Sequence, residues 1–387
     1  MNTHPLTVRK VESRRDFKAF FEFPWAVYKG DPNWVPPLLS MRRHLLDKQR
    51  NPSWEYLTGE YFVAWRGEQP VGTIAAFVNH RHNEHHNENI GWFGCFECYD
   101  DAEAARALLE TASDYVRASG CTAIRGPASF TLNDECALLI ENFEPPVILM
   151  PYNHPYYQRL IEENETGFAK IMDVVSLYVD PDCYLDQNGH FPEKLERVVE
   201  KTKQRRQIST RGPDVRNLTR EIALLREIYE AAWEKNWGFV PPTSREMDAL
   251  FASLKQYYHP ALGVFALVEG KEVGFMLGLP DMNQVLRRAY PRPGEPEVWT
   301  LLKALWHWKI RPKITRNRIL LYGIKEQYRK LGADAAIYMA YLKSSMHIYP
   351  VIDAGWVLET NVGALNQMAT FNAYIYKRYR FYQRPLD

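Results

Sequence analysis

The stretch Leu320-Leu-Tyr-Gly-Ile-Lys-Glu-Gln-Tyr-Arg-Lys-Leu-Gly-Ala-Asp334 indicates how this chain folds. An apolar run typical of a strand leads into a basic turn, and a helical pattern starts at Gly332. Free N–H groups and the helix dipole make such a helix start attractive to anions, and glycine lets the backbone approach closely. Lys325, Arg329 and Lys330 add positive charge. The stretch therefore predicts a phosphate-binding turn, or else an exposed basic turn that merely starts a helix.

Outward from this stretch, the chain reads as two copies of one plan. Phe62–Gly67 with Val71-Gly72, and Phe265–Gly270 with Val273-Gly274, each predict a β-hairpin. Both halves follow the order β-α-α-β-β-β-α-β-α-β. The helical patterns lie at 14–29, 36–49, 102–118 and 133–142, and at 217–236, 244–257, 332–346 and 361–371. A charged helix from Pro192 to Gln207 reads as a solvated connector, so we predict domains at 1–180 and 206–387 around a connector at 181–205.

This element order resembles the GNAT acyltransferase fold, an α/β (α+β) fold with a mixed sheet, here as two GNAT-like domains in tandem. Arg329-Lys-Leu-Gly332 is similar to the start of GNAT motif A, Arg/Gln-x-x-Gly-x-Gly/Ala, although Asp334 stands where Gly or Ala is usual. The resemblance implies that coenzyme A, as acyl-CoA cosubstrate, is held at Ile324, Lys325, Arg329, Lys330, Gly332 and Ala333. The equivalent turn of the first half, Glu97–Glu103, has four carboxylates, no base and no glycine, so it predicts no donor site.

In GNAT enzymes the two central strands splay apart and hold the thioester arm between them. The resemblance places this gap between 319–324 and 354–359. Nearby, it implies Glu359 as a base or amine-orienting group, Asn361 at the strand-to-helix junction, and Tyr376 as the acid for the thiolate. Each has a structural alternative: a junction acid, an N-cap and a strand aromatic.

A narrower resemblance spans nearly the whole chain. It rests on Gly94-Cys-Phe-Glu-Cys-Tyr-Asp-Asp, Arg125-Gly-Pro, Pro151-Tyr-Asn-His-Pro-Tyr-Tyr, Asn236-Trp-Gly-Phe-Val-Pro and Leu279-Pro-Asp-Met-Asn. Together these look like a bacterial tandem-GNAT family that includes bacterial ceramide synthase-like proteins. The family implies N-acylation of an amine, such as a sphingoid-base-like lipid amine, from acyl-CoA or acyl carrier protein. Trp237, Asp281 and Asn283 are candidates for the acceptor site, or simply turn residues.

The charge and composition of the chain indicate which partners and which location to expect. Lys+Arg 48 against Asp+Glu 47 gives a net charge of +1, which disfavours a nucleic-acid partner. Without an N-terminal apolar run or a stretch of about 20 apolar residues, we expect a cytoplasmic protein. His80–His86 reads as a polar loop without metal.

Residues 299–318 hold six bases, no acids and three tryptophans. Such a helix either packs on the core or lies at an anionic membrane surface, which would place the protein peripherally at the inner membrane face.

Two rival functions stay open. A FemX-like transferase also has tandem GNAT-like halves and takes its acyl group from aminoacyl-tRNA. A non-catalytic, degenerate GNAT pair would only bind its ligand, and Asp334 is the best support for that reading. Nucleic-acid affinity distinguishes the first rival, and the absence of turnover distinguishes the second.

Overall fold

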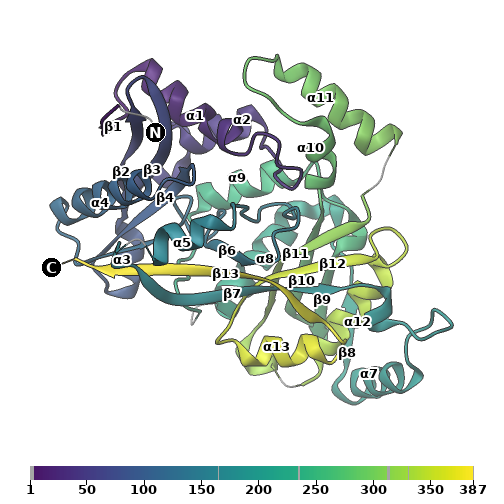
Figure 1. The fold of residues 1–387 in the computed structure, drawn as a ribbon. Helices are drawn as coiled ribbons and strands as arrows, with labels where there is room; N and C mark the ends of the chain where they lie inside the picture. Colours follow the sequence, from purple (N-terminus) through teal and green to yellow (C-terminus); the bar gives the residue numbers. More distant parts are fainter. Residues whose placement is uncertain (1–3, 164, 234–235, 312–313, 330, 387) are drawn as a thin grey trace. The chain divides into compact units, whose positions relative to one another are not determined.

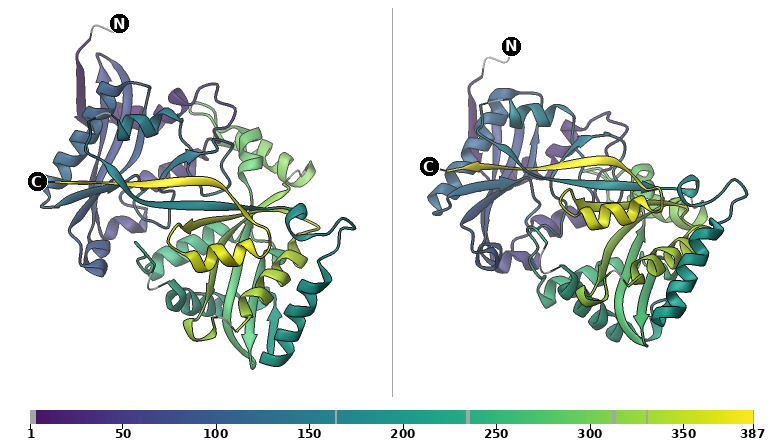
Figure 2. Two further views of the ribbon diagram at one scale, coloured as in Figure 1. Left: turned by 60° about the horizontal axis from the view of Figure 1, so that its bottom comes forward. Right: turned by 90° about the horizontal axis from the view of Figure 1, so that it is seen from below.

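The computed structural model describes residues 4–163, 165–233, 236–311, 314–329 and 331–386. The chain divides into two compact units, each of which draws on distant parts of the sequence. Unit 1 comprises residues 1–174, 285–312 and 377–387, and unit 2 comprises residues 175–284 and 313–376. Strands β7 (Ala169–Val179) and β13 (Tyr374–Pro385) each run from one unit into the other, and Figure 2 shows the two strands side by side.

Unit 1 has an open mixed sheet with strand order β1-β2-β3-β4-β5-β13, and β6 also pairs with β13 (Figure 1). The β4–β5 pairing is parallel, and the other pairings within this unit for which registers are known are antiparallel. Its further elements are β1 (Leu6–Lys10), α1 (Arg14–Val27), α2 (Leu39–Leu46), β2 (Leu57–Arg66), β3 (Gln69–Asn79), α3 (His80–His86), β4 (Ile90–Cys98), α4 (Ala102–Ala118), β5 (Ala123–Gly126), β6 (Leu138–Glu141), α5 (Tyr156–Glu162) and α11 (Glu297–Leu305).

Unit 2 has strand order β7-β12-β11-β10-β9-β8, in which β11 and β12 are parallel. Its elements are α6 (Pro181–Tyr184), α7 (Glu193–Arg206), β8 (Ile208–Arg211), α8 (Leu218–Trp233), α9 (Ser244–Leu254), β9 (Gly263–Val268), β10 (Lys271–Pro280), β11 (Arg316–Ile324), α12 (Ala333–Ser345), β12 (Val351–Leu358) and α13 (Val362–Ala369). Helix α10 (Asn283–Ala289) begins in unit 2 and ends in unit 1.

Both predicted hairpins form, as β2–β3 and β9–β10, and the mixed α/β fold class is confirmed. The expected element order is interrupted by α3 in the first half and by α10 and α11 in the second. The helix predicted at 133–142 is wrong. Thr131 and Asp134 close a turn, with Thr131 Oγ1 donating to Asp134 Oδ2 at 2.7 Å, and the apolar residues that follow form β6. The helix in this part of the repeat is α5, Tyr156–Glu162.

The helix predicted between the halves is α7, and it packs on α12 within unit 2. Val199 is buried in the core of the unit, and Lys343 of α12 pairs with Glu196 at 2.5 Å. Thr202 lies so close to Gly332 that a Cβ there would overlap it. Since Gly332 also has φ +92°, this position requires glycine for two separate reasons.

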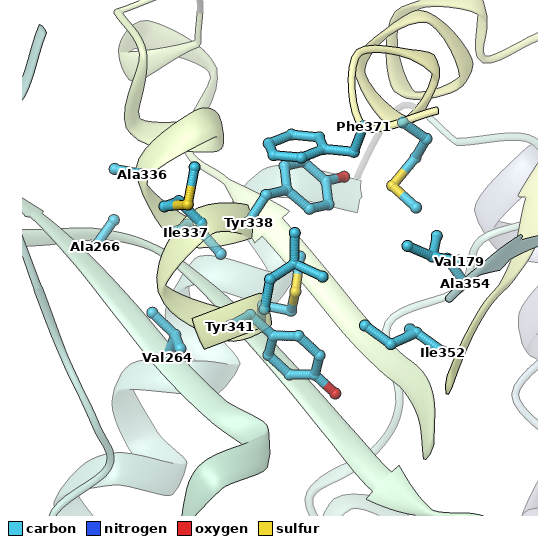
Figure 3. Close-up of a cluster of buried hydrophobic side chains, with 14 of the residues drawn as sticks. Val179, Val264, Ala266, Ala336, Ile337, Tyr338, Tyr341, Ile352, Ala354 and Phe371 are labelled. Atoms are coloured by element: carbon cyan, nitrogen blue, oxygen red, sulfur yellow. The ribbon is translucent and has the colours of Figure 1, made fainter. Parts of the chain in front are cut away.

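Apolar side chains fill both faces of the unit 2 sheet. One cluster joins β7, β9 and β12 to α12, and Figure 3 shows Tyr338 of α12 beside Phe371, with ring centroids 5.4 Å apart. The second cluster joins α8 and α9 to Phe265, Phe275 and Leu321. Because Ile352 and Ala354 face the α12 cluster, the alternation of strand side chains turns Asp353 to the opposite face.

Candidate functional site

Strands β11 and β12 run together for only three residue pairs. Arg316, Asn317 and Arg318 pair with Val351, Ile352 and Asp353. Among the described residues, no pairing joins the two strands beyond this point. The β10–β11 register also shifts between Leu277 and Gly278, which leaves Leu320 as an extra, bulged residue. A bulge bends its strand and increases its twist, and this one lies just beyond the last β11–β12 pair. We call the unpaired stretch of β11 and β12 beyond Arg318 and Asp353 the gap.

Unit 1 repeats this arrangement but fills the gap with its own chain. The β4–β5 ladder also has three pairs, from Ile90 with Ala123 to Trp92 with Arg125, and the β3–β4 register shifts next to Cys95. Beyond the ladder, Ala128 donates a backbone hydrogen bond to Phe93 O at 2.9 Å. A Cβ on Gly94 would overlap the Ala128 carbonyl. The chain after β5 therefore occupies the place that stays unpaired in unit 2.

The acidic turn of unit 1 is neutralised by the protein itself. Arg66 pairs with Asp101 at 2.9 Å and with Glu103 at 2.6 Å, and Asp100 pairs with Arg159. A bound phosphate would find no free base in this set of ion pairs. That this turn holds no nucleotide donor stays a prediction.

Glu97, at the same turn, contacts tyrosine hydroxyls, whereas the other acids of the turn pair with arginines. Its carboxylate accepts hydrogen bonds from the Tyr28 and Tyr157 hydroxyls, both at 2.8 Å. Burial raises the pKa of Glu97 to about 7, although the two hydroxyls partly offset that rise. Glu97 therefore titrates near neutral pH.

A buried polar cluster lies where β11 and β12 begin to part. Arg316 pairs with Asp281 through Nη2, 2.8 Å from Oδ2, and Asp281 is completely buried. Tyr376 donates its hydroxyl hydrogen bond to Asp353, which is also completely buried. Arg318 Nε donates to Gly355 O at 3.2 Å. We call these five residues, Asp281, Arg316, Arg318, Asp353 and Tyr376, the Asp353 cluster.

The charges of this cluster are coupled. Burial alone would lower the pKa of Arg316, but Asp281, Tyr376 and Asp353 outweigh burial and hold it above its usual value. Arg316 therefore stays cationic beside the Tyr376 hydroxyl. Arg316 thus places a fixed positive charge beside the Tyr376 hydroxyl, whose hydrogen bond goes to the Asp353 carboxylate.

Ser176 of β7 adds a buried hydroxyl on the same face. Among the described residues, its Oγ has no hydrogen-bond partner, and its side chain is completely buried. A Cβ on Gly355 would overlap this oxygen, so the two strands approach closely there. A buried hydroxyl without a partner is costly.

In the turn predicted to bind phosphate, Lys325 and Arg329 are both engaged by other groups of the protein. Lys325 Nζ donates to Glu227 at 2.6 Å, and Arg329 donates to Ala232 O at 2.8 Å and Ile324 O at 3.2 Å. Lys330 lies outside the described residues. Helix α12 starts at Ala333, which is buried, directly after Gly332.

Asp334, the departure from the GNAT pattern, stands in the first turn of α12. Its Oδ1 accepts the backbone N–H of Ala335 at 2.8 Å. A carboxylate at the positive end of a helix stabilises the helix. Asp334 thus takes up one donor that a bound anion could otherwise use.

The other predicted site residues are only partly brought together. Tyr376 and Asp281 join the Asp353 cluster. Asn283 opens α10, and its N–H donates to Asp281 Oδ1 at 3.2 Å. Trp237 is half-buried in the turn after α8, and Glu359 is half-buried in the turn after β12. Asn361 is the N-cap of α13, with Oδ1 accepting from Ala364 N at 3.1 Å, as its structural alternative predicts.

Sequence reasoning missed Ser176, Arg316, Arg318 and Asp353. The available signal was a charge inside an otherwise apolar strand. Arg316 and Arg318 flank Asn317 at the start of β11, and Asp353 interrupts Val-Ile-Asp-Ala-Gly in β12. Charged residues are rarely buried unless they are paired, so such positions point to partners across the sheet.

Solved structures show which fold this chain has. A tandem GNAT protein from the clavulanic acid biosynthesis pathway superposes with a TM-score of 0.51, covering 99% of this chain and 100% of that chain at 11% identity. A GCN5-related N-acetyltransferase from Sphaerobacter thermophilus gives 0.52, covering 99% and 97% at 11% identity. The fold is a tandem GNAT fold.

Two relatives align with this chain over nearly its whole length. Protein YghO of Escherichia coli (strain K12) is 30% identical over 385 residues, 98% of this chain and 95% of that protein. The bacterial ceramide synthase of Caulobacter vibrioides (strain NA1000 / CB15N) is 29% identical over 388 residues, 98% of each. No protein-family model matches. The chain belongs to the tandem GNAT-like family that includes these two proteins, which confirms the resemblance drawn from the sequence.

Proposed function

We propose that this protein is an N-acyltransferase that moves an acyl group from a thioester, acyl-CoA or acyl carrier protein, to a primary amine. The observation that carries the proposal is the gap between β11 and β12. Unpaired strand edges can bind an extended pantetheine arm as an added strand would. In unit 1 the equivalent gap holds Ala128, so the proposed donor site belongs to unit 2.

The reaction forms one bond, breaks one bond and moves two protons. The amine nitrogen attacks the thioester carbonyl carbon, the carbon–sulfur bond breaks, and the amine loses a proton while the thiolate gains one. In this proposal Tyr376 gives its hydroxyl proton to the thiolate, and Arg316 stabilises the phenolate that remains. Asp353 accepts the Tyr376 hydroxyl hydrogen bond before transfer, and this hydrogen bond breaks when the proton passes to the thiolate. Glu359 takes the proton from the amine.

Some residues of the predicted coenzyme A turn suit a phosphate, and others are already bonded to the protein. Gly332 and the start of α12 suit a phosphate, but Lys325 and Arg329 are bonded to protein groups. Donor binding would therefore need the ammonium of Lys325 to exchange Glu227 for phosphate. We propose Ile324, Lys325, Arg329, Gly332 and Ala333 as the coenzyme A turn, with Lys330 beside them in sequence.

The acceptor proposal is a lipid amine of the sphingoid-base type. It rests on the name of the Caulobacter relative and on full-length coverage by that relative. Trp237, Asp281 and Asn283 remain the proposed acceptor residues. Among them, Asp281 is bonded to Arg316, so it would act by holding Arg316 in place.

Calorimetric titration with acetyl-, octanoyl- and palmitoyl-CoA tests the donor step. Saturable binding that strengthens with chain length supports a fatty acyl donor. Turnover with sphinganine and with short amines, followed by mass spectrometry of the amide, tests the acceptor. If no acyl-CoA binds and loaded acyl carrier protein gives no amide, the acyltransferase proposal is wrong.

The engagement of Lys325 and Arg329 favours one second candidate, a protein that binds a ligand without turnover. Amide formation from a thioester distinguishes an acyltransferase from a protein that only binds. A binding protein would retain a lipid amine or fatty acid through gel filtration yet form no amide from any thioester.

A further inference from the structure

Helix α11, labelled in Figure 1, belongs to unit 1 and leaves most of its apolar side chains exposed. An amphipathic helix of a globular protein normally buries its apolar stripe. Here the buried residue is Thr300, and the apolar residues are about half exposed. They are Val298 55%, Trp299 57%, Leu301 50%, Leu302 51%, Leu305 49%, Trp306 46% and Ile310 60%. We call these seven residues the α11 surface.

These residues form one continuous stripe. At 100° per residue, Val298, Leu302 and Leu305 fall within one narrow sector of α11, with Trp299 and Leu301 on either side. Trp306 and Ile310 extend the stripe through the π-helical turn that follows, Trp306–Ile310. The face opposite this stripe carries Thr300. Contiguous exposed apolar patches of this kind mark interaction sites.

The protein holds α11 in this orientation by polar contacts at its start. Glu297 accepts hydrogen bonds from both the N–H and the hydroxyl of Ser40, each at 3.0 Å. Before the helix, Pro291 O accepts the Trp25 indole N–H at 2.7 Å, and Tyr290 packs edge-on against Trp34. Each of these groups belongs to unit 1. The outward apolar face is therefore a fixed feature of this unit.

Apart from Glu297, the charged residues of 297–311 are basic. Lys303, Lys309 and Arg311 are exposed, and within the described part of the chain none of them is ion-paired with a carboxylate. Glu297 is the one acid in α11, and it is bonded to Ser40. Arg316 and Arg318, which the sequence grouped with this helix, instead belong to β11, where Arg318 is buried and Arg316 is bound to Asp281. The α11 surface, which includes two exposed tryptophans, thus lies beside bases that have no carboxylate partner among the described residues; one of them, Arg311, lies over the Trp306 ring.

We propose that the α11 surface binds the interface of an anionic lipid bilayer. Apolar side chains flanked by lysine and arginine insert into the headgroup region, and tryptophan favours that depth. No helix among the described residues is long and apolar enough to span a bilayer, so the proposed contact is interfacial. The charge pattern favours this occupant over a second copy of the chain, because two such surfaces would bring like charges together.

The test is cosedimentation of the full chain with vesicles of phosphatidylcholine, with and without phosphatidylglycerol. We expect binding to the anionic vesicles, weaker binding at high salt, and little binding to phosphatidylcholine alone. The triple variant Trp299→Ser, Leu302→Ser and Trp306→Ser should bind at least about tenfold more weakly. Failure of the wild type to bind anionic vesicles overturns the proposal.

A matched control removes exposed apolar side chains elsewhere, with Val198→Ser, Val215→Ser and Ile348→Ser. This control should bind vesicles like the wild type. Equal binding by both triple variants would show that the α11 surface is not the contact. Sedimentation velocity on the same proteins tests whether the α11 surface instead binds a second copy of the chain. If the wild type is a dimer that does not bind vesicles, and the α11 variant is a monomer, the surface is a dimer interface.

The proposal does not depend on acyl transfer. Its readout is partition between vesicle and solution, with no substrate present. A protein that binds vesicles but forms no amide would refute the proposed function alone, and one that forms amide without binding vesicles would refute this inference alone.

Discussion

The hydroxyl of Tyr376 donates a hydrogen bond to Asp353, a carboxylate from which solvent is fully excluded. The two residues lie on different strands, 23 positions apart in the sequence. Their contact places a proton donor beside the gap between β11 and β12. Both Tyr376 and Asp353 also interact electrostatically with the Arg316 guanidinium.

If Tyr376 protonates the leaving thiolate, Tyr376→Phe should lower the turnover number by about 10²-fold with little change in donor affinity. Tyr374→Phe is the matched control, because Tyr374 is an exposed tyrosine of the same strand that also packs on Tyr178. Steady-state kinetics with saturating acyl-CoA and amine measure the effect. Equal rates for the two variants would remove Tyr376 from the mechanism.

Removal of Arg316 should strongly destabilise unit 2. Arg316→Leu leaves the completely buried Asp281 carboxylate without its partner, and breaking a buried pair in this way costs about 3–5 kcal/mol. Arg197→Leu removes an exposed partner of Glu193 and should cost less than about 1 kcal/mol. Urea denaturation of both variants provides the comparison. A small loss for Arg316→Leu would mean that water or another base compensates Asp281.

Glu97 should make the folded state less stable as the pH rises towards neutrality. Its pKa is raised by burial to about 7, so between about pH 4.5 and pH 7 the folded chain holds more protons than the unfolded chain. Stability then falls across this window by about 3 kcal/mol. Glu97→Gln should remove that loss, seen as a flatter dependence of the unfolding free energy on pH.

His82 also contributes to the pH dependence of the unfolding free energy, so its contribution has to be distinguished from that of Glu97. Burial lowers the pKa of His82 to about 4, so the stability from this residue falls as the pH drops below about 6.5, the opposite slope. The difference between wild type and Glu97→Gln isolates Glu97, because His82 is present in both. Glu163→Gln, at an exposed position, should leave the wild-type profile unchanged. A parallel profile for Glu97→Gln would contradict the prediction.

The filled gap of unit 1 leads to a packing prediction. In Gly94→Ala the new methyl group meets the Ala128 carbonyl, a backbone atom that cannot move alone. Overpacking of this kind costs about 1–3 kcal/mol. Gly212→Ala, where nothing lies within 4 Å of the added Cβ, should be nearly neutral. Thermal unfolding of the two variants distinguishes a tightly filled gap from a loose one.

Local patterns in the sequence predicted most elements, because hairpins and amphipathic helices are set by neighbouring residues. The β2–β3 and β9–β10 hairpins, α8 and α12 lie where their patterns place them. The Asp353 cluster escaped prediction because it depends on strand register. Nothing near Asp353 in sequence indicates Tyr376, and only the tertiary fold brings them together. The helix predicted at 133–142 failed for a related reason, since pairing with β13 decides that Leu138–Glu141 is a strand.

The crossing of β7 and β13 between the units has a consequence for biosynthesis. Unit 1 needs strand β13, which completes its sheet beside β5, and that strand follows the whole of unit 2 in the chain. During translation the first unit to begin is therefore the last to be finished. Its edge at β5 stays open until the second unit has been made, so a ribosome that stalls within unit 2 leaves a nascent protein with an unpaired strand exposed to solvent.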